Sequence, residues 1–115
     1  MWLPISATSG AAAIVLGAFG AHALKARLGL EALSTWNTAV LYHLVHSVVL
    51  LALALYASSS GRGIAVPAVL FSSGVVLFSG SLYLLVLAEW SWLGPVTPIG
   101  GLLLVAGWLS LWSVR

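Results

Sequence analysis

Four long stretches without a charged side chain divide the sequence, and their lengths decide what kind of protein it can be. The six charged residues leave uncharged runs at positions 1–24, 32–61, 63–88 and 90–114. Each run exceeds the roughly 20 residues that a helix needs to cross a bilayer. Because backbone amides in hydrocarbon must be satisfied within their own segment, these runs predict four transmembrane helices.

Prolines and small polar residues indicate where the helices begin and end. Pro4 and Pro98 suit the first turn of a helix, where the missing N–H has no cost, and the segment SSSGRG (58–63) is typical of a turn. We therefore expect helices at about 5–23, 35–56, 64–88 and 97–114. With short connections, they predict an all-α, integral membrane, up-down-up-down four-helix bundle. It would form a single transmembrane domain (1–115) with both termini on one side.

The first run also resembles a secretory signal, because Ala21-His22-Ala23 has the small-x-small pattern of a cleavage site. No basic residue precedes the apolar stretch, and three further spanning runs follow it. We therefore expect the first helix to be retained.

The composition supports a membrane protein. Hydrophobic residues make up 62% of the chain and charged residues 5%, too few to cover a soluble surface. Cysteine is absent, which excludes disulfides, thiolate catalysis and cysteine-based metal sites. No basic cluster indicates nucleic acid, and the expected surroundings are the lipid bilayer.

Tryptophans lie near the predicted helix ends. Trp36, Trp90 and Trp92 lie near the 1–2 and 3–4 connections, whereas Trp2, Trp108 and Trp112 lie towards the opposite face. This pattern predicts two interfacial belts, although Trp108 is deep for such a position.

Small residues recur at spacings that permit close helix packing. In lipid, helices associate where small side chains let their backbones approach. The predicted packing residues are Ser9, Ala13, Gly17, Gly20, Ala21, Gly80, Gly100, Gly101 and Gly107.

Polar and irregular segments converge on one half of the bundle. The segments GAFGAH (17–22), YHLVH (42–46), FSGSLY (78–83) and GPVTPIGG (94–101) all lie towards the same membrane face in this topology. We expect a cavity that opens on that face. Ionisable residues at such a depth are costly and usually face the bundle interior. The candidate ligand or polar-cavity residues are His46, Tyr42, His22, Ser79, Ser81, Tyr83, Thr97, Glu89 and His43.

Several kinds of chemistry fit these residues in part. His43 and His46, three residues apart, could chelate a metal with His22 or Glu89, but the signal is weak. A histidine could also be an axial haem ligand, or the set could form a path for protons or small solutes. Ser-His-acid catalysis lacks both a nucleophile motif and a buried acid. The sequence thus predicts no enzyme and identifies no metal site or cofactor, while haem or metal binding stays open.

The motifs also resemble a known family. GAFGAHALK (17–25), TAVLYHLVH (38–46), LFSGSLY (77–83) and VTPIGGLLLVAGW (96–108) occur in this order. Together they resemble the small four-helix membrane proteins called transmembrane protein 256-like, or domain of unknown function 423. The resemblance covers essentially the whole chain. The positions that match the family pattern are Gly17, Gly20, His22, Tyr42, His46, Ser79, Gly80, Ser81, Tyr83, Thr97, Pro98, Gly100 and Gly101.

The resemblance implies a protein of the bacterial inner (plasma) membrane with no established activity, and it favours cytoplasmic termini. His43 departs from the family pattern, in which an amide is often found at that position. This departure argues against a mechanism that needs the pair of His43 and His46, and it directs attention to His46.

Two functions are expected from these observations. The first is an accessory or structural subunit, or a self-associating helical module, that acts in a homo-oligomer or a larger membrane complex. The alternative is binding or conduction of a small solute, proton, metal or haem in a one-sided intramembrane cavity around His46.

Overall fold

The computed structural model describes residues 1–114, and all the regular secondary structure in this range is helical. The four long helices are α1 (Trp2–Phe19), α2 (Leu30–Ser60), α3 (Ala65–Leu87) and α4 (Val96–Ser110). Short turns adjoin them: the π-helical η1 (Gly20–Leu24) and the 3₁₀ turns η2 (Ser91–Leu93) and η3 (Leu111–Ser113). With these turns included, each of the four spans is long and apolar enough to cross a membrane. The predicted fold class is confirmed.

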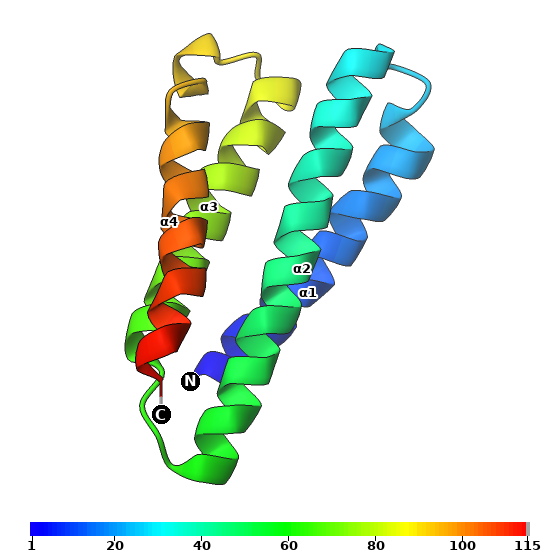
Figure 1. Cartoon of the computed structure of the whole chain (residues 1–115). Helices are drawn as coiled ribbons and strands as arrows, with labels where there is room; N and C mark the ends of the chain where they lie inside the picture. Colours follow the sequence, from blue (N-terminus) through cyan, green and yellow to red (C-terminus); the bar gives the residue numbers. More distant parts are fainter. Residues whose placement is uncertain (115) are drawn as a thin grey trace.

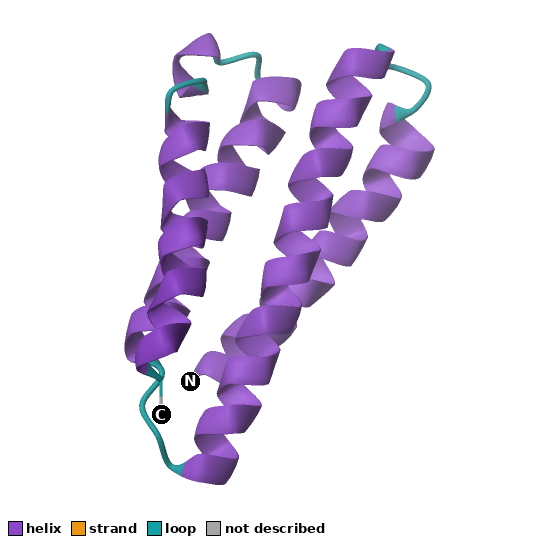
Figure 2. Ribbon diagram, in the orientation of Figure 1, coloured by secondary structure: helices purple, strands orange, loops and turns teal. Residues whose placement is uncertain are grey.

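The helices run antiparallel, with both ends of the chain at the same end of the molecule (Figure 1). Helices α1 and α2 form one hairpin and α3 and α4 form the other; the principal contacts join helices that are neighbours in sequence. The two hairpins approach each other near the termini and diverge towards the 1–2 and 3–4 connections (Figure 2). This arrangement leaves one flank of α1 without a closely packed helix.

Helix α2 extends beyond the predicted range 35–56 at both ends. Glu31 had marked the end of an uncharged run, but a carboxylate in the first turn of a helix is favourable. At the other end, Ser59 and Ser60 donate hydrogen bonds to the Tyr56 carbonyl, and Gly61 ends the helix with a φ of 71°. Its 31 residues measure about 46 Å, longer than the ~30 Å hydrocarbon core, so its ends reach the headgroup layers.

The apolar core lies towards the end that holds the termini and is built from α2, α3 and α4. Its buried members are Leu50, Leu53, Ile64, Ala68, Phe71, Val75 and Leu104. Helix α1 contributes little to it, since Ser6 and Ala13 are the buried residues of that helix. The fold is therefore a three-helix core with α1 packed on the side of α2.

Most of the predicted packing glycines lie at close helix crossings. A Cβ atom at Gly100 would overlap the backbone of Leu77 and Phe78, which shows how closely α4 approaches α3 there. At Gly107 it would lie 2.8 Å from the Phe71 ring, and at Gly20 2.5 Å from Trp36. These glycines pack because their neighbours occupy the space of a side chain.

Two of the predicted packing positions do not pack against another helix of this chain. Nothing lies within 4 Å of a Cβ built on Gly80, and Ala21 is exposed. Gly80 lies on the face of α3 that looks towards the open flank of α1, where no helix comes close.

Trp36 is fully buried, so the prediction that it belongs to an interfacial belt is wrong. Its indole N–H donates a 2.9 Å hydrogen bond to the Leu16 carbonyl, and its ring lies 4.7 Å from that of Tyr83. Trp90 and Trp92 are exposed at the 3–4 connection, with their rings stacked 6.0 Å apart. The interfacial tryptophans of this end are therefore these two.

Candidate functional site

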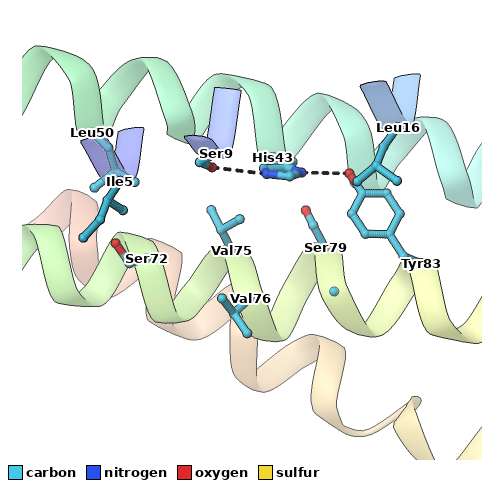
Figure 3. Close-up of a pocket in the computed structure, with 11 residues that line it drawn as sticks. Ile5, Ser9, Leu16, His43, Leu50, Ser72, Val75, Val76, Ser79 and Tyr83 are labelled. Atoms are coloured by element: carbon cyan, nitrogen blue, oxygen red, sulfur yellow. Dashed lines mark hydrogen bonds between the residues drawn. The ribbon is translucent and has the colours of Figure 1, made fainter. Parts of the chain in front are cut away.

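A chain of hydrogen bonds centred on His43 joins three helices. Its Nδ1 lies 3.0 Å from the Tyr83 hydroxyl of α3, and its Nε2 lies 3.2 Å from the Ser9 hydroxyl of α1. The Ser9 hydroxyl lies 2.6 Å from that of Ser47, which donates to the His43 carbonyl at 2.7 Å. His43 is buried, and Figure 3 shows its ring between Ser9 and Tyr83.

The direction of every bond in this chain follows from one carbonyl group. A carbonyl only accepts, so the proton of Ser47 is committed to it, and Ser9 must therefore donate to Ser47. The Ser9 oxygen then accepts from Nε2–H of His43. With a neutral ring, Nδ1 accepts from Tyr83, so neutral His43 is held as the Nε2–H tautomer.

A half-enclosed cavity of about 360 Å³ lies beside these hydrogen-bonded residues, between α1 and α3. Figure 3 shows how its walls are arranged: α1 supplies Ile5, Ser9 and Leu16, α2 supplies His43 and Leu50, and α3 supplies the remaining wall. The residues from α3 are Ser72, Val75, Val76, Ser79, Gly80 and Tyr83. The cavity therefore follows the open flank of α1 for much of its length.

His46 lies outside this cavity and has a different set of neighbours. Its Nδ1 lies 2.7 Å from the Tyr42 carbonyl, and its Nε2 accepts a 3.1 Å hydrogen bond from the Trp108 indole. Because an indole N–H can only donate, Nε2 is unprotonated and Nδ1–H donates to Tyr42. Both ring nitrogens are occupied, so His46 joins α2 to α4 and does not line the cavity between α1 and α3.

The depth of Trp108 is explained by the same contact. Its indole is held beside His46 and packs edge-on against Phe71, with ring centroids 5.5 Å apart. Tyr42 is partly exposed, and its ring lies 4.6 Å from that of Phe78. Trp108 and Tyr42 therefore serve the packing around His46.

The remaining predicted hydroxyls tie neighbouring helices together. Ser79 donates a 2.7 Å hydrogen bond to the Ala39 carbonyl and so joins α3 to α2. Ser81 donates to the Phe78 carbonyl, so the 2.6 Å contact between Ser81 and Thr97 has Thr97 as its donor. This pair joins α3 to α4, apart from the cavity.

The structure does not bring together the residues that were considered for metal binding. His22 is exposed at the π-helical turn, and Glu89 is exposed beyond the end of α3. His43 faces α1 and α3 whereas His46 faces α4, so the two rings do not converge. Within residues 1–114, no group of three histidine, aspartate or glutamate side chains could hold a metal ion.

Comparison with known proteins identifies the family. A family model described as "Protein of unknown function (DUF423)" matches residues 16–101. The chain belongs to this family. It is 37% identical over 113 residues to the UPF0382 membrane protein YwdK of Bacillus subtilis, covering 96% of this chain and 92% of that protein. It is 35% identical over 111 residues to a UPF0382 membrane protein of Staphylococcus aureus, with 96% and 91% covered.

A UPF0382 membrane protein of Haemophilus influenzae is 38% identical over 110 residues, with 96% of this chain and 89% of that protein covered. No solved structure matches the chain. The resemblance noted from the motifs is confirmed, and the chain is a bacterial membrane protein of the DUF423 family with four candidate spans.

Sequence reasoning missed several members of this DUF423 site. The sequence pattern assigns Ser9 and Ser72 to helix packing alone and does not mark Ser47. Ser47 follows His43 by four residues, a spacing that allows a serine to bond the preceding carbonyl. The unusual depth of Trp108 was the available signal for a buried partner. Ser72 lies seven residues before Ser79, a spacing that indicates packing and not an unpaired hydroxyl.

Proposed function

We propose that this DUF423 protein is a non-catalytic membrane protein that binds an elongated, largely apolar molecule in the cavity between α1 and α3. The observation that carries the proposal is a cavity with apolar walls and one buried hydroxyl, that of Ser72, without a partner in residues 1–114. Small-molecule sites typically have volumes of about 300–1,000 Å³ and apolar walls with a few polar groups. The cavity volume of about 360 Å³ falls within this range.

The shape of the cavity favours a long ligand. Its lining on α3 runs from Ser72 to Tyr83, a distance of about 16 Å along a helix. Val75, Val76 and Leu16 supply apolar surface along this length. A chain-like or flat polycyclic molecule suits such a wall better than a compact polar one.

Ser72 indicates where the polar atom of the ligand would lie. Serine hydroxyls in helices commonly bond a carbonyl one turn back, as Ser73 does with Val69 at 2.7 Å. The Ser72 oxygen is buried without such a bond, and Figure 3 shows it directed towards Ile5 across the cavity. Leaving it unpaired costs about 1–3 kcal/mol. A carbonyl or hydroxyl oxygen on the ligand would recover much of that cost once the side chains that cover the Ser72 oxygen turn aside.

The arrangement of protons supports binding rather than catalysis. Ser9 and His43 lie at the spacing of a nucleophile and its base, but His43 donates to Ser9, so Nε2 cannot take the serine proton. The other ring nitrogen meets the Tyr83 hydroxyl rather than a carboxylate. The side chains that line the cavity include no charged group, which also disfavours an ion path.

The test is to identify what co-purifies with the protein in mild detergent. We expect mass spectrometry of extracts from the wild type to reveal one apolar species in near-stoichiometric amount. Gly80→Leu should reduce it at least about tenfold, because Gly80 lines the cavity and a Cβ at this position has nothing within 4 Å, so the new side chain takes up space meant for the ligand. Gly80→Ala is the matched control and should retain most of it. Equal recovery from Gly80→Leu would contradict the proposal.

An accessory role, in a homo-oligomer or a larger membrane complex, is the competing function. It is favoured by Gly80, since a partner helix could approach α3 closely where nothing lies within 4 Å. We propose it second because a cavity of this size admits a ligand or single side chains, not a helix. If a stoichiometric polypeptide co-purifies and is lost with Gly80→Leu, the accessory role replaces ligand binding.

We also propose that the protein lies in the plasma membrane with both termini in the cytoplasm. The chain has no cysteine, so single introduced cysteines report topology without background. In intact cells, a membrane-impermeant maleimide should label Ser91→Cys, at the 3–4 connection. It should label Ser59→Cys, at the 2–3 turn, only after the membrane is disrupted. The reverse pattern would invert the orientation.

A further inference from the structure

A second, charged cleft lies at the end of the molecule that holds the 1–2 and 3–4 connections. It has a volume of about 600 Å³ and lies between the start of α2 and the end of α3. Arg27, Glu31 and Glu89 line it, together with Thr35 and apolar residues. Both of the protein's acidic side chains and one of its four basic side chains therefore face one cleft.

The length of α2 indicates where this cleft lies relative to the membrane. At about 46 Å the helix exceeds the hydrocarbon core, and Glu31 lies in its first turn. Trp90 and Trp92 lie one and three residues after Glu89, and both are exposed, as expected at the boundary between lipid and water. The cleft therefore opens where phospholipid headgroups lie.

Within the described residues, these three charged side chains form no ion pair. In residues 1–114, no basic nitrogen lies within 4.0 Å of a carboxylate oxygen. Glu89 also keeps a left-handed backbone, with a φ of 56°, that an L side chain rarely adopts. The cleft thus presents one guanidinium and two carboxylates to whatever enters it.

We propose that this cleft binds the headgroup of a phospholipid that carries both a phosphate and a primary ammonium. A guanidinium pairs well with phosphate oxygens, whereas an ammonium with three N–H donors pairs with carboxylates. The excess of acidic over basic groups disfavours a lipid whose headgroup is only anionic. A quaternary ammonium lacks N–H donors and is usually recognised by aromatic faces, and no aromatic residue lines the cleft.

The site is distinct from the cavity between α1 and α3. The two sites share no lining residue: Thr35 and Val86 line the cleft, whereas Tyr83 lines the cavity. The ring of Trp36, the residue after Thr35, packs against that of Tyr83. Failure of either proposal therefore leaves the other standing.

The test compares lipids that share acyl chains and differ in headgroup. Native mass spectrometry of the purified full chain, titrated with phosphatidylethanolamine, phosphatidylcholine or phosphatidylglycerol, measures the retained lipid. Two added ion pairs at a partly exposed site predict that phosphatidylethanolamine binds roughly fivefold more tightly than phosphatidylcholine. Free phosphoethanolamine at high concentration should compete, which separates the headgroup from the acyl chains as the source of recognition.

Substitutions test which part of the headgroup each charged side chain binds. The double variant Glu31→Gln and Glu89→Gln should bring the two lipids to equal affinity, and Arg27→Gln should weaken phosphatidylethanolamine and phosphatidylglycerol alike. Arg62→Gln, in the 2–3 turn at the other end, is the control and should change nothing. All four side chains are exposed, so folding should be preserved. Equal binding by the wild type, or tightest binding of phosphatidylglycerol, would overturn the proposal.

Discussion

Replacing Gly100 with alanine should cost the folded protein about 3 kcal/mol of unfolding free energy. A Cβ at this position would overlap the backbone of Leu77 and Phe78, so α4 must move away from α3 to accommodate it. Backbone atoms of a packed helix cannot move aside as a flexible side chain can. The hydrogen bond between Thr97 and Ser81, one turn away, would also be lost. Reversible unfolding in mixed micelles, followed by circular dichroism, measures the difference.

Gly101→Ala is the matched control because it makes the same chemical change one residue along the same helix. Its Cβ would lie 3.7 Å from the Phe78 ring, an ordinary contact. Since alanine is the better helix former by roughly 1 kcal/mol, Gly101→Ala should be neutral or slightly stabilising. Equal losses for the two variants would mean that α3 and α4 do not cross closely at Gly100.

Replacing His43 with leucine should cost about 2 kcal/mol, more than the same change at His46. The change removes bonds to two other helices at once and leaves the Tyr83 hydroxyl without its acceptor. His46→Leu breaks one bond to another helix, and its partner Trp108 is 48% exposed. The same unfolding measurement, made on both variants, shows which substitution is more destabilising.

His43→Gln provides the control for the chemistry of the ring. An amide carries both a donor and an acceptor, so it can replace the bonds to Ser9 and Tyr83 in part. It should recover at least about half of the unfolding free energy that leucine loses. Tyr83→Phe should lower the unfolding free energy less in the His43→Leu background than in the wild type. A larger loss at His46 than at His43 would mean that the site centres on α4 instead.

The helices were predictable because charges in hydrocarbon are expensive, and the spacing of six charged residues marks the four spans. The ends of α2 were not predictable in this way, because charged side chains are no longer excluded outside the hydrocarbon core. Glu31 sits inside the helix, where the dipole favours it. A rule based on hydropathy thus finds the segment that crosses the membrane and misses the turns that project from it.

The site was predictable in its residue types but not in its partners. Helical periodicity places His43 and His46 on one side of α2, yet their rings meet different helices because α1 and α4 pack at different positions around it. Likewise Gly80 and Gly100 look alike in sequence, and only the helix crossings distinguish the open position from the crowded one. Crossing geometry depends on the whole set of packed side chains, which no local pattern contains.

The most direct test of the central claim is to capture what occupies the cavity between α1 and α3. A photo-crosslinking amino acid at Val76, which lines the cavity, should form an adduct of a single small mass in living cells. The same group at Val69, exposed on α3 but outside the cavity, should give only the mixture of bulk lipids. Gly80→Leu should abolish the discrete adduct. A polypeptide adduct at Val76, or the same lipid mixture at both positions, would contradict the account.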